Sequence, residues 1–523
     1  MVAVAALLVL AAGAASGQSS PLPEPRIAFA TSGSGEAQRE FLRGVEALHN
    51  FEYEQAHEAF QRALTIDPSF AMAVWGEAMT YHQTLWRNED MAAGRKALAR
   101  LGPTPAARSA RIPTARERGF FAAAEALFGE GDVDTRRGRY AEAMARVYEA
   151  APDDPEAASF YALALLGTMS RSLIGYVDSH EGHSASLAGS ETQRRVGEIL
   201  AGVLRAHPEH PGALHYLLHN YDDPEHARLG LEAARTYARV APAESSHAQH
   251  MPAHIFLQLG MWSEAATSDR AAYAGSEAWV KARGLPLTMR SYHSLSWLQY
   301  ELLQLGRFDE AWDTVGTLSP VVTSSGDLGL LSDLSSMRAR FVIETRRWSM
   351  MANERNFGNI NELCAIGISA ARSANPSLAE LARQALAGRS VAPEEGDLRP
   401  AAAIMEREVA AIIELTAGRR ERAVDILRAA SAAELALPPP LGLPVPIKPA
   451  PELLGEVLLE IGRPAEAVEP FQQALARNAN RTLSQLGLAR ATAALGQADV
   501  SRGHYEAVLV NLAEADAGLA EVE

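Results

Sequence analysis

The stretch EAQREFLRGVEALHNFEYEQAHEAFQRALTIDP, from Glu36 to Pro68, decides the fold of this chain. Small, aromatic and proline residues stand in it at the offsets of a helical hairpin of about 34 residues: Gly44, Tyr53, Ala56, Phe60, Ala63 and Pro68. The small residues let two helices approach closely, and the proline ends the second helix because its nitrogen carries no hydrogen. The stretch therefore predicts two antiparallel helices joined by a short turn.

The same pattern returns along the chain. The segment GRYAEAMARVYEAAPDDP, from Gly138 to Pro155, places Ala143, Val147 and Ala150 at matching offsets. Five segments, LGMWSEA, LGRFDEA, AGRRERA, IGRPAEA and LGQADVS, mark further turns between helices, with their glycines at Gly260, Gly306, Gly418, Gly462 and Gly496. This is the tetratricopeptide pattern, in which each hairpin buries its apolar stripe by stacking on a neighbour. The sequence predicts an all-α, right-handed superhelix (an α-solenoid) with a concave face.

Composition divides the chain into five segments. Residues 1–17, MVAVAALLVLAAGAASG, form an apolar run ending in small residues, which is typical of a secretory signal peptide. We expect a disordered linker over 18–36, the repeat array over 37–436, a proline-rich strap over 437–451 and C-terminal hairpins over 452–516. The signal predicts a periplasmic or secreted protein, and it is too short to favour a membrane span.

The strap reads LPPPLGLPVPIKPAP. It is not expected to be helical, because its prolines lack the amide hydrogen and clash with the preceding turn. We expect an extended polyproline segment, which either links two parts of the array or lies across the groove.

Charge and motif content exclude several functions. The chain carries 48 basic and 64 acidic side chains, a net charge of −16. Binding to a phosphate backbone needs a concentrated basic face, which the sequence lacks, so we expect no nucleic-acid partner. The phosphate-loop and nucleophile-elbow motifs are also absent. Cys364 is the only cysteine, which rules out an intramolecular disulfide and suggests a small buried hydrophobe.

The histidines are strongly clustered. Ten of the fifteen fall between His180 and His254. His215 and His219 are four residues apart and therefore share one face of a predicted helix, and His250 repeats this spacing with His254. The two pairs are one repeat apart, so the helices that carry them are expected to lie side by side.

Repeat numbering places several side chains in the groove. In tetratricopeptide hairpins the first helix lines the concave face, and counting back from Gly260 and Gly306 puts His247, His250 and His293 on such helices. We assign four residues to a partner-binding groove: His82, Trp86, His247 and Glu452.

Longer segments resemble a family of bacterial, usually exported tetratricopeptide proteins of uncharacterised function. They are FAMAVWGEAMTYHQTLW, HPGALHYLLHNYDDPEHA, HAQHMPAHIFLQLGMW, GLPLTMRSYHSLSWL, LPPPLGLPVPIKPAPELLGE and ANRTLSQLGLARA, spread over most of the chain. The resemblance implies the fold and no reaction. This sequence departs from the family pattern at Gln83 and Pro451, where relatives often carry histidine.

Two interpretations of the histidines stay open. In the first, the chain is an exported scaffold whose concave groove binds a peptide or protein segment, and the histidines line the groove or cap helices. In the second, a zinc, copper or iron ion is held by two or three imidazoles at about 2.0 to 2.1 Å. An open position for water would then make a hydrolase or an oxidase conceivable, and the sequence leaves open whether any reaction is catalysed.

The metal interpretation names five ligands: His215, His219, His250, His254 and His293. The central pair is expected to be His250 and His254, joined by His293 as third ligand and His219 as fourth. We expect Pro252 in the first turn of their helix, where a missing amide hydrogen is tolerated. Imidazole ligands favour zinc or copper over calcium and magnesium.

An oxygen ligand from Asp222 or Glu244 is also compatible with this interpretation. Neither HxxxH pair contains the glutamate of the HExxH zinc-protease motif, so that mechanism is unsupported.

Overall fold

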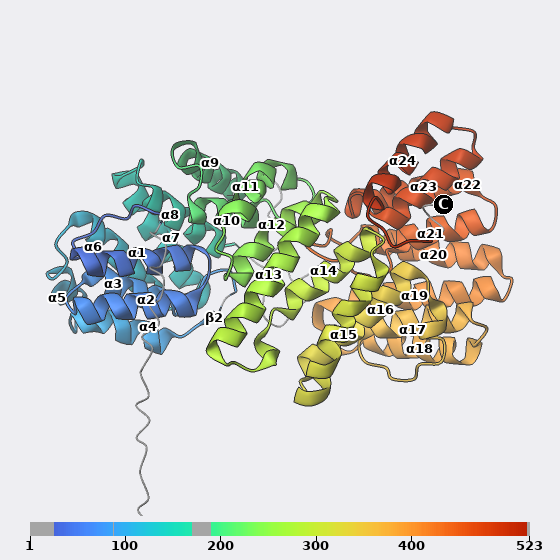
Figure 1. Cartoon of the computed structure of the whole chain (residues 1–523), viewed down its shortest axis with the longest axis horizontal. Helices are drawn as coiled ribbons and strands as arrows, with labels where there is room; N and C mark the ends of the chain where they lie inside the picture. The colour runs from blue at the N-terminus through green and yellow to red at the C-terminus, as the bar shows by residue number, and fades with distance from the viewer. Residues whose placement is uncertain (1–25, 87, 170–189, 520–523) are drawn as a thin grey trace, which may run out of the picture.

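The computed structural model describes residues 26–86, 88–169 and 190–519. In these ranges 24 α-helices follow one another as antiparallel hairpins, and successive hairpins stack into an elongated, curved array with the first and last helices at opposite ends (Figure 1). The prediction of an all-α superhelix of tetratricopeptide type is confirmed. The predicted signal over 1–17 lies outside the described residues. Within the described ranges no helix has the length and apolar character needed to cross a membrane.

The first half of the array contains thirteen helices and one two-stranded ladder in the described residues. The helices are α1 (Gly35–His49), α2 (Tyr53–Ile66), α3 (Ala71–Met79), α4 (Met91–Leu98), α5 (Pro105–Ser109), α6 (Ala115–Leu127), α7 (Val133–Ala150), α8 (Pro155–Gly167), α9 (Glu191–Ala206), α10 (Pro211–Asn220), α11 (Ala227–Val240), α12 (Ser246–Gln258) and α13 (Trp262–Arg283). Strands β1 (His82–Gln83) and β2 (Asn88–Glu89) pair antiparallel, with His82 opposite Glu89.

The second half, described as far as residue 519, continues with eleven helices. They are α14 (Tyr292–Gln304), α15 (Phe308–Ser325), α16 (Leu328–Thr345), α17 (Ile360–Arg372), α18 (Pro376–Arg389), α19 (Arg399–Thr416), α20 (Arg420–Leu435), α21 (Ala450–Glu460), α22 (Pro464–Arg477), α23 (Thr482–Ala494) and α24 (Ala498–Asn511).

The turns within hairpins fall where the sequence predicts them. All five predicted turn glycines have positive φ, between 66° and 82°. In this left-handed region a side chain clashes with the backbone, so glycine is favoured. The first hairpin differs, because Phe51 occupies the equivalent position with φ 59°.

Large aromatic rings fill the spaces that the small residues leave. A Cβ atom on Gly44 or Gly76 would lie 2.5 or 2.3 Å from the ring of Phe60, so both neighbouring helices need glycine at these points. At the other end of the array, Gly455 and Gly487 make the same contacts with Phe471. The repeat therefore uses one packing device at both ends of the chain.

The prediction of a disordered linker over 18–36 is wrong for residues 26–36, the part that the structure describes. Ile27 and Phe29 are buried, and the Phe29 ring lies 5.3 Å from that of Phe41 and 4.9 Å from that of Phe120. These apolar contacts hold the segment before α1 against the first hairpin, because burial removes two large side chains from water.

The strap predicted over 437–451 occupies residues 436–449, between α20 and α21, and packs against the middle of the array. The predicted end is wrong, because Ala450 and Pro451 form the first turn of α21. Arg477 donates hydrogen bonds to two strap carbonyls at 3.0 Å, and Gln258 of α12 donates to the Pro440 oxygen at 3.3 Å. A Cβ atom on Gly442 would lie 2.7 Å from the ring of Trp297 in α14. The strap thus joins the C-terminal hairpins to α12 and α14.

Candidate metal centre

Three helices carry the histidines that the sequence singled out. Helix α10 carries His215 and His219, α12 carries His247, His250 and His254, and α14 carries His293. Ser245 begins α12 by accepting a hydrogen bond from the Ala248 amide at 3.2 Å. Helix α10 begins in the same way: the Nδ1 atom of His210 accepts from the Ala213 amide at 3.1 Å.

The imidazoles form two groups, and we name the first the α10 triad. It contains His215, His219 and His247, which are at most 9% exposed. The Nε2 atom of His215 lies 3.1 Å from Nε2 of His247 and 3.1 Å from Nε2 of His219. Three ring nitrogens therefore point at one place between α10 and α12.

The second group, the α12 triad, contains His250, His254 and His293. The Nε2 atom of His250 lies 3.0 Å from Nε2 of His254 and 3.0 Å from Nε2 of His293. His250 and His254 are buried, at 1% and 0% exposure, and His293 is half-buried.

The sequence predicts one site that combines His219 with His250, His254 and His293, and this grouping is wrong. His219 is not the fourth ligand of His250, His254 and His293, because it faces His215 in the α10 triad. His247, predicted to line the groove, completes that triad instead.

The predicted position of Pro252 is also wrong. Pro252 lies inside α12 and not in its first turn, since the Ser245 cap starts the helix earlier.

The other ring nitrogen of three histidines donates to a fixed acceptor. Nδ1 of His215 donates to the backbone oxygen of His49 at 2.6 Å, and Nδ1 of His254 donates to Oδ2 of Asp222 at 2.8 Å. Nδ1 of His250 donates to Oδ1 of Asp269, on α13. These bonds place the hydrogen of each neutral ring on Nδ1, so its Nε2 presents a lone pair.

The two oxygen ligands suggested by the sequence do not face the Nε2 atoms. Asp222 accepts a hydrogen bond from Nδ1 of His254, the ring nitrogen that does not face the triad. Glu244 lines a neighbouring cavity.

Within the α12 triad this arrangement places two hydrogen-bond acceptors next to each other. The neutral rings of His250 and His254 each donate their one N–H hydrogen to an aspartate, yet their Nε2 atoms are 3.0 Å apart. Two lone pairs at this distance repel each other unless they share a cation. A shared proton is one solution, but burial disfavours a charged imidazolium. In the α10 triad, burial holds the pKa of His215 well below its usual range, and the neighbouring imidazole of His247 lowers it further.

Aromatic rings enclose both triads. The Phe51 ring lies 4.4 Å from that of His215, 5.6 Å from that of His219 and 5.5 Å from that of His247. Phe51 stands at the position where other hairpins have a turn glycine, and its backbone has a positive φ that is strained for a phenylalanine. Its ring lies against the α10 triad. Trp297 plays the same part at the α12 triad, 4.9 Å from the ring of His250 and 4.5 Å from that of His254.

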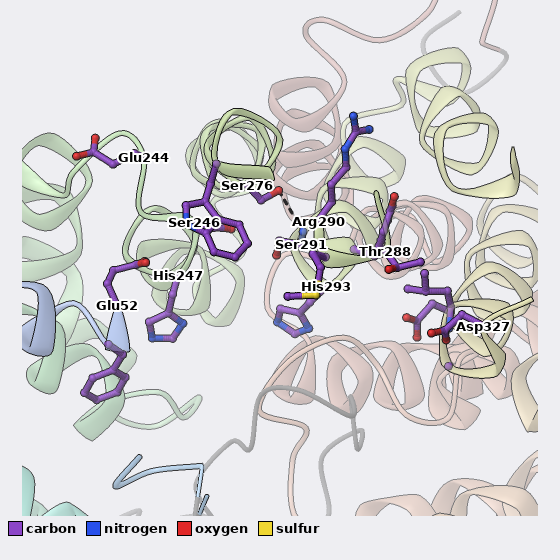
Figure 2. Close-up of a pocket in the computed structure, with 17 residues that line it drawn as sticks. Glu52, Glu244, Ser246, His247, Ser276, Thr288, Arg290, Ser291, His293 and Asp327 are labelled. Atoms are coloured by element: carbon purple, nitrogen blue, oxygen red, sulfur yellow. Dashed lines mark hydrogen bonds between the residues drawn. The ribbon is translucent and has the colours of Figure 1, made fainter. Parts of the chain in front are cut away.

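A cavity of about 390 Å³ borders both triads. His247 from the α10 triad and His293 from the α12 triad line it, and Figure 2 shows their two rings projecting in the same direction. Phe51, Trp279 and Tyr292 supply apolar walls.

Four of the five charged residues in the cavity lining are acidic. Its charged residues are Glu52, Glu244, Asp327, Asp333 and Arg290. The Arg290 guanidinium is paired with Glu277 at 2.9 Å, so acidic groups dominate. The cavity is large enough for a small molecule.

A third cluster, His49, Glu156 and His210, is satisfied by its own hydrogen bonds. Glu156 lies 2.7 Å from Nε2 of His49 and 3.2 Å from Nε2 of His210, and its pKa is lowered by both histidines against the effect of burial. The hydroxyl of Tyr216 lies 2.8 Å from Nδ1 of His49. Donors face acceptors throughout, so this cluster is a structural support for α1, α8 and α10.

The remaining predicted groove residues lie in different places. Trp86 is half-buried, and its ring lies 5.2 Å from that of His247. His82 is buried beside Thr84 and is absent from the lining of the cavity; burial lowers its pKa to about 3. Glu452 is fully buried between Lys448 and Arg481, so it does not line a groove as predicted.

Sequence reasoning missed two supporting residues. Asp269 is on α13, and only the packing of two helices brings it to His250. Phe51 could have been noticed, because it stands where other hairpins carry glycine.

The chain matches no protein-family model and no curated protein. Among solved structures it is similar to the APC/C hetero-tetramer Cut9–Hcn1, with 12% identity, a TM-score of 0.30 and coverage of 94% of this chain and 95% of that one. It is also similar to the TPR domain of P58(IPK), with 12% identity, a TM-score of 0.21 and coverage of 89% of this chain and 99% of that one. The human IFIT1 dimer with m7Gppp-AAAA shows 13% identity, a TM-score of 0.31 and coverage of 92% of this chain and 96% of that one.

Proposed function

We propose that the protein binds two transition-metal ions, one in each histidine triad, and that the ions are zinc or copper. The observation that carries this proposal is the convergence of the Nε2 atoms within each triad. Three of the six rings, those of His215, His250 and His254, have already donated their Nδ1 hydrogen. Two nitrogens at about 2.05 Å from one ion are about 3.3 Å apart around a tetrahedral zinc ion and about 2.9 Å apart around a square-planar copper ion. The spacings of 3.0 and 3.1 Å in the triads lie between these two values.

The surroundings support ligation. Metal-bound histidines usually donate their second nitrogen to a carboxylate or a backbone carbonyl, which orients the ring and raises its basicity. Asp222, Asp269 and the His49 carbonyl fill this role. The ligands are all imidazoles, which suit zinc and copper and not calcium or magnesium.

Three protein ligands leave at least one coordination position open, which is typical of catalytic and not of structural sites. The cavity beside His247 and His293 gives such positions access to a small molecule. We therefore infer a metalloprotein with reactive or ligand-binding ions, and we extend the proposal to export, because residues 1–17 have the composition of a secretory signal.

A scaffold that binds a peptide or protein segment is the second candidate. The concave helical array and the 390 Å³ cavity favour it. The histidines give it little support, because five of the six in the triads are at most 9% exposed. A peptide would have to use the acidic and aromatic lining of the cavity instead.

Elemental analysis of untagged protein, purified without chelators and then loaded with zinc or copper, tests the proposal. We expect two ions per wild-type chain and one ion in each of two double variants, His215→Ala/His219→Ala and His250→Ala/His254→Ala. The control His207→Ala/His504→Ala removes two histidines outside the triads and should keep two ions. Equal metal content in all four proteins, or none after loading, would reject the proposal.

A further inference from the structure

Adjacent turns of one helix connect the two triads. His247 belongs to the α10 triad and His250 to the α12 triad, and the two are three residues apart on α12. Residues at this spacing are neighbours on a helix surface, with Cβ atoms about 5 to 6 Å apart. The second contact between the triads is the packing of α10 against α12. Two ions held there would be bound by residues on adjacent turns of α12.

Both triads also open on the same cavity. His247 and His293 come from different triads, and each lines it. A ligand that enters the cavity can therefore reach both groups of imidazoles. Neutral imidazoles leave each ion its full positive charge, so a negatively charged oxygen donor is the favoured occupant of the open positions.

Carboxylates line the cavity at both ends, and Glu52 and Glu244 lie on the side of His247. Asp327 and Asp333 of the α16 segment line the opposite wall, and Figure 2 shows Asp327 on the far side of His293 from His247. Asp327 also begins α16, since its Oδ1 accepts from the Leu330 amide at 3.0 Å. A positively charged group on the ligand would meet carboxylates at this wall.

We propose that the two triads form one two-metal centre, and that its ligand is a small amino-carboxylate, with the carboxylate shared by the ions and the ammonium group facing Asp327 and Asp333. This inference rests on the proposed function, because it requires an ion in each triad. It adds that the two ions act together and that the ligand has a negative and a positive end.

Copper(II) resonance spectra test the shared centre. The wild-type protein with two copper ions is compared with the two double variants, each holding one ion, in the presence of 4-aminobutyrate. We expect the wild-type spectrum to lose at least half of its integrated intensity relative to the sum of the variant spectra, through coupling of the two ions. A wild-type spectrum equal to that sum would overturn the shared centre while leaving metal binding intact.

Competition between two probes tests the ligand class. We expect 4-aminobutyrate to bind the two-copper protein at least tenfold more tightly than acetate, which has the carboxylate alone. The variant Asp327→Asn/Asp333→Asn should remove this preference and leave the affinity for acetate unchanged, since asparagine keeps the cap of α16. Equal affinity for the two probes in the wild type, or a preference that survives in the variant, would overturn the proposed ligand.

The metal content of the same samples separates the two proposals. A protein that binds no copper, or only one ion, contradicts the proposed function and this inference together. A protein that binds two ions but fails the spectral or the competition test contradicts this inference alone.

Discussion

The array contains two buried polar clusters, and they differ in the way their charges are satisfied. In the C-terminal half, Arg481 is 0% exposed and lies 2.7 Å from both Glu452 and Glu344, while Lys448 lies 2.7 Å from Glu452. Every contact there joins opposite charges. In the α12 triad, the acceptor nitrogens of His250 and His254 face each other. The first cluster pairs its charges within the chain, and we propose that a metal ion completes the second.

The difference follows from where each cluster lies. The charge network joins α16, α21, α23 and the strap, which hold the last hairpins in place. The histidine triads lie in the middle of the array beside a cavity. If every ring nitrogen there were hydrogen-bonded within the chain, no nitrogen would be left to bind a ligand. Buried polar groups thus serve structure at one site, and we propose that they serve binding at the other.

The largest effect is expected from breaking the charge network. Arg481→Met leaves the carboxylates of Glu452 and Glu344 buried without their main counter-charge. Removing one partner of a buried ion pair costs about 3–5 kcal/mol. Denaturant unfolding of the metal-free protein measures this loss, and a loss below about 1 kcal/mol would contradict the structural role of the network.

Metal loading should affect the other cluster alone. An ion that binds only the folded chain stabilises it by about 2.7 kcal/mol when its concentration is 100 times its dissociation constant. We expect thermal unfolding of the wild type to shift upward with zinc, and His215→Ala/His219→Ala/His250→Ala/His254→Ala to lose the shift. Arg481→Met should keep it, although its starting stability is lower. A zinc shift in the quadruple histidine variant would place the ion elsewhere.

The features of the fold and of the histidine site that depend on local spacing in the sequence could be predicted. The turn glycines, from Gly260 to Gly496, and the paired histidines on α10 and α12 follow from periods of one repeat and one helical turn. A repeat fixes which helices are neighbours, and this was enough to bring the histidines together.

The sequence did not predict how the histidines divide. Whether His219 faces His215 or His254 depends on the rotation and shift between two packed helices, and a pattern of apolar residues does not fix these to within a few ångströms. Asp269 was missed for the same reason. Glu452 was placed in the groove because its helix follows the strap, whereas Lys448 and Arg481 draw it inside.

A smaller effect is expected from a residue that supports one of the proposed metal ligands. Asp269→Asn weakens the acceptor that holds Nδ1 of His250, while the side chain keeps its shape. Loss of such a supporting group typically reduces metal affinity 10- to 100-fold, which corresponds to about 1.4–2.7 kcal/mol. Competition with a chelator of known affinity gives the change for one ion. The exposed Asp313→Asn is the control, and an equal affinity in the two variants would argue against ligation by His250.

The smallest effect concerns pH and the edge of the charge network. Glu434 is 2% exposed, and its Oε2 accepts from the Ala450 amide at 2.7 Å. Burial raises the pKa of Glu434 to about 7, and the nearby Arg477 only partly opposes this. The folded chain therefore holds this proton more tightly than the unfolded chain, whose carboxyl titrates near the ordinary value of about 4.3.

The sign of the pH effect follows from this difference. Stability from the protonated Glu434 is fully present below the unfolded pKa and is lost as the pH rises through about 7. Between pH 6 and pH 7 the wild type should lose about 1 kcal/mol relative to Glu434→Gln, which does not titrate. Denaturant unfolding at the two pH values, with metal removed, measures the difference. If Arg477 instead keeps Glu434 ionised, the two proteins will show the same pH dependence, and the charge network will be complete at its edge as well as at its centre.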